Sequence, residues 1–92
     1  MSVTIEYSAQ IKQALGLASE RIELGPTRTV AGILEVLTRR HGESFRHFVP
    51  ADGGPRRGTL LLSVNDEQVF RDTPIELRDG DILRIMSPIA GG

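Results

Sequence analysis

One amphipathic helix pattern in the first half of the chain most strongly limits how the chain can fold. Four apolar residues recur at the i, i+3, i+4 and i+7 positions of a single helix face: Val30, Ile33, Leu34 and Leu37. Thr29 stands at the N-cap position, residues 39–41 place basic side chains in the last turn, and Gly42 follows. The pattern predicts a helix over residues 30–41, whose apolar face needs a second layer to pack against.

Short segments with strand patterns surround this helix. Two precede it and three follow it, over residues 3–7, 21–24, 59–64, 68–70 and 82–86. The pairs Gly25-Pro26, Asn65-Asp66 and Asp79-Gly80 are typical of turns and of strand ends. One helix between two groups of short strands therefore predicts a sheet with the helix on one face.

Two further segments permit less definite predictions. Residues 9–17 carry spaced apolar side chains and then glycine, which fits either a helical turn or a structured loop. Phe45, Phe48 and Val49 fit one short helical turn over the edge of the core. Residues 50–58 hold three glycines and two prolines, which predicts a mobile loop.

The order of these elements predicts a two-layer α+β fold. A length of 92 residues suits one domain. With the helix crossing between the second and third strands, we expect a β-grasp, in which one main helix packs on a mixed four- to five-stranded sheet. The domain is expected to span residues 1–86, and residues 87–92 to form an extended, flexible tail.

Composition excludes several classes of function. The chain has no cysteine, which rules out disulfides, thiolate nucleophiles and zinc ribbons. Its net charge is −1 and Lys12 is its one lysine, so the clustered positive surface that nucleic-acid binding requires is not expected. No apolar stretch is long enough to span a membrane, and no basic leader opens the chain, so we expect a cytoplasmic protein without membrane partners.

Side chains suited to catalysis or metal binding do not form a recognisable pattern. His41 and His47 lack cysteines or paired carboxylates at ligand spacing, and we interpret them as a helix-end cation and a surface residue. The glycine-rich residues 53–59 lack the Lys-Ser/Thr of a phosphate-binding loop. We therefore expect no metal site and no catalytic residues of the chain's own.

The C-terminus is the feature most suited to chemistry. It consists of Ser87, Pro88, Ile89, Ala90, Gly91 and Gly92. The proline stiffens the stem, Ile89 and Ala90 can anchor it by apolar contact, and the two glycines carry no Cβ that would block a narrow tunnel. A terminal carboxylate can enter another protein's active site end-first, although a glycine pair by itself is equally typical of a frayed end.

Three stretches follow one another along the second half of the chain: residues 64–67 (Val-Asn-Asp-Glu), 77–82 (Leu-Arg-Asp-Gly-Asp-Ile) and the terminus from Ser87 to Gly92. In this order they resemble the MoaD and ThiS family of sulfur carriers, which are ubiquitin-like β-grasp proteins. Residues 7–11 (Tyr-Ser-Ala-Gln-Ile), with 14–16 beyond them, resemble the molybdopterin synthase small subunit, MoaD, in particular.

The resemblance implies a carrier rather than an enzyme. An adenylyltransferase that uses ATP would activate the Gly92 carboxylate, and a sulfur donor would convert the acyl-adenylate to a thiocarboxylate. The residues from Ser87 to Gly91 would lie inside the partner during these steps. The sulfur would then pass to an acceptor, of which the large molybdopterin synthase subunit is the first candidate. The carrier itself would bind no cofactor.

Three alternatives stay open at this point. The acceptor can instead belong to cysteine or thiamine biosynthesis. The chain can be a ubiquitin-like modifier that is joined through Gly92 to lysines, or a plain β-grasp interaction module whose tail is inert.

Two features suggest where partners would bind. Alternation in the last strand places Leu83 and Ile85 on one face and Arg84 and Met86 on the other, so Met86 is expected on the outer surface beside the tail. Family members often carry an aromatic residue at the position of Met86 and another apolar residue at that of Gln68. These two positions are therefore candidates for the partner surface, and this chain departs from the family pattern at both. Four acidic residues precede the last strand, and a solvated turn is favoured over a basic partner for them: Asp72, Glu76, Asp79 and Asp81.

Overall fold

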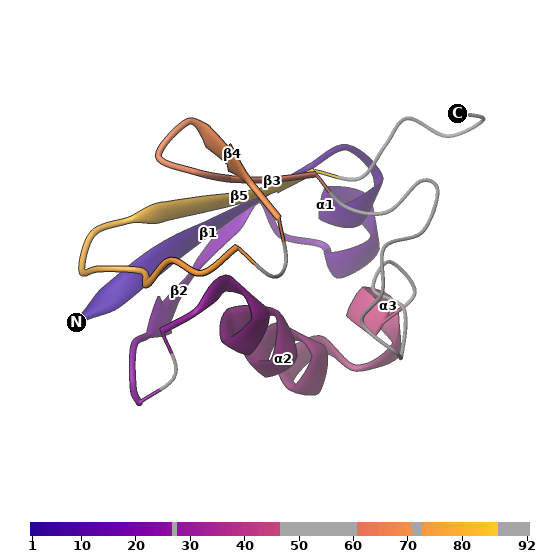
Figure 1. Ribbon diagram of the computed structural model, residues 1–92. Helices are drawn as coiled ribbons and strands as arrows, with labels where there is room; N and C mark the ends of the chain where they lie inside the picture. Colours follow the sequence, from indigo (N-terminus) through magenta and orange to yellow (C-terminus); the bar gives the residue numbers. More distant parts are fainter. Residues whose placement is uncertain (27, 47–60, 71–72, 87–92) are drawn as a thin grey trace.

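The computed structural model describes residues 1–26, 28–46, 61–70 and 73–86. Along the chain the elements are β1 (Ser2–Ser8), α1 (Ala9–Leu15), β2 (Ser19–Glu23), α2 (Val30–His41), α3 (Glu43–Arg46), β3 (Leu61–Val64), β4 (Glu67–Val69) and β5 (Ile82–Met86). Figure 1 shows α2 lying along one face of the sheet, with the short helices α1 and α3 grouped at one end. Phe48, Val49, the expected loop 50–58 and the expected tail 87–92 lie outside the described residues.

The five strands form one mixed sheet in the order β2-β1-β5-β3-β4. The middle strand β5 and its neighbour β1 are parallel and pair from Thr4 with Ile82 to Ser8 with Met86. All other neighbouring strands are antiparallel. The prediction of a β-grasp with one main helix on a mixed sheet is therefore confirmed.

The bounds of α2 agree with the sequence because both of its caps are local. Thr29 has an extended backbone, and its Oγ1 accepts a hydrogen bond from the Gly32 amide at 3.1 Å. Gly42 has a positive φ of 64°, and its amide donates to the Thr38 carbonyl at 2.8 Å. Between these caps the helix buries the face that the sequence predicted.

One hydrophobic core fills the space between α2 and the sheet. Its residues alternate along the strands and recur on the helices: Val3, Ile5, Tyr7, Ile11, Ile22, Leu24, Val30, Ile33, Leu34, Leu37, Phe45, Leu62, Val64, Val69, Leu77, Leu83 and Ile85. Residues 9–15 form a helix that buries Ile11 and ends at Gly16 in the left-handed region, which resolves the first open segment. Phe45, on α3, is fully buried, so the expected helical turn over the core edge is confirmed for Phe45.

The second strand departs most from the sequence expectation. We predicted residues 21–24, whereas β2 starts at Ser19 and ends at Glu23. Pairing with β1 continues down to Ser19 opposite Glu6. The sequence does not reveal that β2 starts at Ser19, because Glu20 occupies an inward-facing position where the alternation of a strand predicts an apolar residue.

Two phenylalanines provide a test of this core. Phe45 is fully buried, whereas Phe70 is 64% exposed. We expect Phe45→Ala to lower the free energy of unfolding by about 3–5 kcal/mol, since it removes a large apolar side chain and leaves a cavity. Phe70→Ala is the matched control and should stay within about 0.5 kcal/mol of wild type in urea unfolding. Equal losses in the two variants would contradict the assignment of Phe45 to the core.

Candidate functional site

The predicted tail begins where β5 ends, at Met86, the last residue that the structure describes. There β5 lies between β1 and β3, and Met86 pairs with Ser8 on one side and with Leu61 on the other. The predicted site residues Ser87, Pro88, Ile89, Ala90, Gly91 and Gly92 lie outside the described residues. The structure therefore locates the origin of the tail in the middle of the sheet.

The sheet face away from α2 carries exposed apolar side chains beside this origin. Leu61 and Met86 are a cross-strand pair and are 48% and 40% exposed. Phe70 directly follows β4, and continuing the β3–β4 register by one residue would place it beside Leu61. We call Leu61, Phe70 and Met86 the apolar patch. Exposed apolar side chains grouped in this way are typical of protein-binding surfaces.

Both residues that the sequence suggested for a partner surface lie on this outer face. Met86 belongs to the apolar patch, and Gln68 is exposed and pairs with Ser63, which in turn pairs with Arg84. Their role in binding stays a prediction. The sequence did not point to Leu61, because the run of leucines at residues 60–62 hides the alternation that would mark its outward position.

A row of charged side chains crosses the outer face next to the apolar patch. The Arg84 Nε lies 2.8 Å from Glu6 Oε1, and its Nη1 also bonds to the Asp66 carboxylate. The hydrogen bond that Arg84 donates to Glu6, reinforced by the one that it donates to Asp66, raises the pKa of Arg84 above its ordinary value. The guanidinium is thus fixed as a cation in the centre of the face.

The acidic residues before β5 organise the turn rather than forming a free patch. Asp79 Oδ1 accepts a hydrogen bond from the Ser2 amide at 2.8 Å. Asp81 accepts from Asn65 Nδ2 and from the Arg78 amide, both at 2.8 Å. These contacts support the interpretation of a solvated turn. Asp72 lies outside the described residues.

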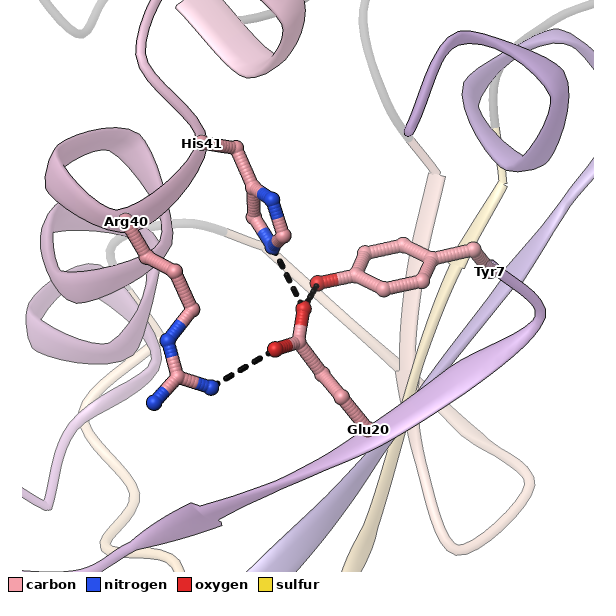
Figure 2. A network of polar contacts seen from close by, with 4 residues as sticks. All are labelled: Tyr7, Glu20, Arg40 and His41. Carbon is pink, nitrogen blue, oxygen red and sulfur yellow. Dashed lines mark hydrogen bonds and ion pairs between the residues drawn. The ribbon is translucent and has the colours of Figure 1, made fainter. Parts of the chain in front are cut away.

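A polar network on the α2 side of the sheet was not foreseen from the sequence. Figure 2 shows the Glu20 carboxylate, from β2, surrounded by Tyr7, Arg40 and His41. The Tyr7 hydroxyl donates to Glu20 Oε2 at 2.5 Å, and His41 Nε2 lies 2.6 Å from the same oxygen. Arg40 Nη1 lies 2.7 Å from the other oxygen, Oε1. The network joins β1, β2 and the last turn of α2.

Burial and hydrogen bonding act in opposite directions on the Glu20 carboxyl. The side chains of Glu20 and His41 are only 12% and 15% exposed. Burial raises the pKa of Glu20, but the hydrogen bonds from Tyr7, Arg40 and His41 outweigh it, so the pKa lies below its ordinary value. Burial, and then the bond to Glu20, raises the pKa of Tyr7. Glu20 is therefore an anion at neutral pH and Tyr7 a neutral donor.

This network corrects the interpretation of His41. We expected a cation at the end of the helix, and His41 does lie in the last turn of α2. Its ring, however, turns inward to Glu20 and packs edge-on to Tyr7, with centroids 6.2 Å apart. The one sequence feature that pointed to the network is Glu20, a charged residue on the inward-facing side of β2. His47 lies outside the described residues.

The described parts of the chain contain neither a cluster of metal ligands nor a membrane-spanning helix. In residues 1–26, 28–46, 61–70 and 73–86 no three potential metal ligands come together. Among those same residues, no helix has the length and apolar character needed to cross a membrane.

Comparison with known proteins shows the family. Residues 5–92 match the model of the ThiS family. The chain belongs to the ThiS family. This match includes Gly91 and Gly92, so the tail falls inside the matched region. The chain is thus a small ubiquitin-like protein of a sulfur-carrier family. No curated protein matches the sequence.

Solved structures with the same fold carry different names. SAMP1 from Haloferax volcanii is 20% identical, with full coverage of both chains and a TM-score of 0.82. A Pyrococcus furiosus protein named as a molybdopterin converting factor subunit 1 is 30% identical over 97% of this chain and 99% of that one, with a TM-score of 0.75. A chain of the Amycolatopsis orientalis BexX/CysO complex is 28% identical over 98% and 99%, with a TM-score of 0.68.

The pH dependence of stability tests the network. The folded-state pKa of Glu20 is depressed, so its contribution is fully present above its unfolded value of about 4.3 and is lost as the pH falls through the folded value. At pH 7 we expect Glu20→Gln to lower the free energy of unfolding by about 1–3 kcal/mol, because a charged acceptor is lost. The difference from wild type should shrink below about pH 4.

Glu35→Gln is the matched control for this experiment. Glu35 lies on the exposed side of α2, where its carboxylate is 4.0 Å from Arg39. We expect its unfolding free energy to stay within about 0.5 kcal/mol of wild type at every pH. A Glu20→Gln difference that did not change between neutral and acid pH would show that Glu20 acts by shape alone.

Proposed function

We propose that this ThiS-family protein carries sulfur as a thiocarboxylate at Gly92. The observation that carries the proposal is the family match through residue 92, together with the exit of β5 beside the apolar patch. A central strand is held on both sides, so the residues that follow it start from a rigid support. A thin glycine end on a rigid base suits delivery of a carboxylate into a partner's active site.

The chemistry is a two-step exchange on the terminal carboxylate. An oxygen of Gly92 attacks the α-phosphorus of ATP in the activating enzyme, the bond to the β-phosphate breaks, and pyrophosphate leaves. Hydrosulfide then forms a C–S bond to the acyl carbon, the bond to AMP breaks, and AMP and a proton leave. With a persulfide donor, its terminal sulfur forms the C–S bond as AMP leaves, and a thiol reductant then cleaves the S–S bond of this acyl disulfide, which gives the thiocarboxylate and a disulfide. The carrier contributes its carboxylate and its docking surface, and the partner supplies the catalytic groups.

Molybdopterin biosynthesis is the acceptor pathway that we propose first. Its support is the 30% identity, over nearly the whole chain, to the Pyrococcus furiosus protein named for molybdopterin conversion. A second candidate is a carrier for another sulfur-accepting enzyme, such as one of cysteine biosynthesis. The 28% identity to a chain of the BexX/CysO complex favours it.

Intact-mass spectrometry tests the carrier chemistry. After incubation with an enzyme that activates ThiS-family carriers, ATP and a sulfur donor, we expect one oxygen of the chain to be replaced by sulfur, located at Gly92 by fragmentation. A chain that lacks Gly91 and Gly92 should stay unmodified, while Lys12→Arg, the matched internal control, should be modified like wild type. An unchanged mass of the wild-type chain with an enzyme that modifies its own carrier would count against the proposal.

A second measurement tests the apolar patch as the docking surface. We expect Met86→Glu and Leu61→Glu to raise the KM of the activating enzyme for the carrier by about tenfold or more, because each places a charge in a desolvated contact. The rate at saturation should change little. Glu35→Gln, on the opposite layer, should leave KM as in wild type. A KM unaffected by either patch variant would assign docking to another surface.

A further inference from the structure

The edge strand β2 has a free backbone side among the described residues. In the ladder with β1, the Leu24 amide donates to the Met1 carbonyl and the Tyr7 amide donates to the Ala18 carbonyl, both at 2.8 Å. The register shows that the backbone N–H and C=O groups of Glu20 and Ile22 also point toward β1. Because this direction alternates from one residue to the next in an antiparallel ladder, the backbone groups of Ser19, Arg21 and Glu23 point away from β1.

The side chains on this free edge are self-complementary. Ser19, Arg21 and Glu23 are exposed and lie on the outer face of the sheet. Edge strands are often protected by charges of one sign, which repel a second edge. Here a cation and an anion stand two residues apart, so an antiparallel copy of the same strand can oppose each charge with its opposite.

Only some registers satisfy both the backbone and the charges. Residues whose backbone groups point away from β1 must lie opposite one another in the two copies, because each such pair exchanges two hydrogen bonds. A register centred on Arg21 meets this condition but opposes two arginines. A register centred on Ile22 also meets it and places Arg21 opposite Glu23 of the second copy, and Glu23 opposite Arg21. Cross-strand pairs of opposite charge stabilise a sheet and like charges destabilise it.

We propose that two copies of this chain associate through β2 in the register centred on Ile22. The association is a two-fold dimer with four backbone hydrogen bonds, two Arg21–Glu23 ion pairs and one continuous ten-stranded sheet. The two Ile22 side chains would meet on the α2 side.

The contacts that Glu23 and Glu20 already make are compatible with this dimer. Glu23 Oε2 lies 3.7 Å from the N-terminal ammonium, and both groups are exposed, so this ion pair is weak and can be exchanged. Glu20 is engaged on the α2 side by Tyr7, Arg40 and His41. Its carboxylate therefore does not compete for Arg21, and its bonds hold β2 against α2.

The dimer leaves the proposed carrier function undisturbed. The apolar patch lies over β3 and β5 and next to β4, at the other side of the sheet from β2. Since β2 pairs antiparallel with its copy, the two β5 strands also run in opposite directions. Their C-terminal ends therefore point to opposite ends of the ten-stranded sheet, where two partners can bind without meeting.

Charge exchange tests the proposal. Sedimentation equilibrium of wild type should show an average mass that rises from 10.1 kDa toward twice that value as the concentration enters the millimolar range. Arg21→Glu and Glu23→Arg should each raise the dissociation constant by about tenfold or more, because each variant places two pairs of like charges opposite one another in the dimer. A mixture of the two variants should dimerise again, since every opposed pair is then of opposite charge.

Glu67→Arg, on the far edge strand β4, is the matched control and should dimerise like wild type. In amide NMR spectra, the concentration-dependent shifts should concentrate on Ser19, Arg21 and Glu23. A mass of 10.1 kDa at every concentration would overturn the proposal. So would dimers that survive in both single variants, or a mixture that behaves as the separate variants do.

Discussion

The parallel pairing of β1 with β5 is the contact on which the rest of the molecule depends. It joins Thr4 to Ile82 and Ser8 to Met86, and so links the middle strand of the sheet to its interior neighbour. Leu83 and Ile85, fully buried on β5, complete the core beneath α2. Because the last strand is central, the chain leaves the sheet between two hydrogen-bonded neighbours. This position gives the expected tail a firm base at Met86, which itself belongs to the apolar patch.

The Glu20 network holds the second layer in place. A helix such as α2 can slide over a smooth apolar face, since hydrophobic contact is not directional. The carboxylate of Glu20 accepts from β1 through Tyr7 and from α2 through Arg40 and His41, so it fixes the end of the helix over the edge of the sheet. Directional bonds at one end and apolar packing along the rest together specify one arrangement of the two layers.

Prediction from the sequence succeeded where the signals were local. The α2 bounds followed from Thr29 and Gly42, and the buried face of β5 followed from alternation. Residues 9–17 stayed open because a seven-residue helix is too short to show a period. The Glu20 network could not be predicted, because its partners lie 13 to 21 residues away in the chain. The apolar patch depends on the β3–β5 register, which alternation alone does not reveal.

The central position of β5 also has a consequence for how the protein is made. The β1–β5 contacts connect residues that are 78 positions apart, since Thr4 pairs with Ile82. Such long-range pairs close slowly, and during synthesis they cannot form until the final strand has left the ribosome. A chain cut short before β5 would lack the middle of its sheet and would be exposed to proteases. Only chains in which β5 is intact would therefore keep the folded support from which the predicted tail starts.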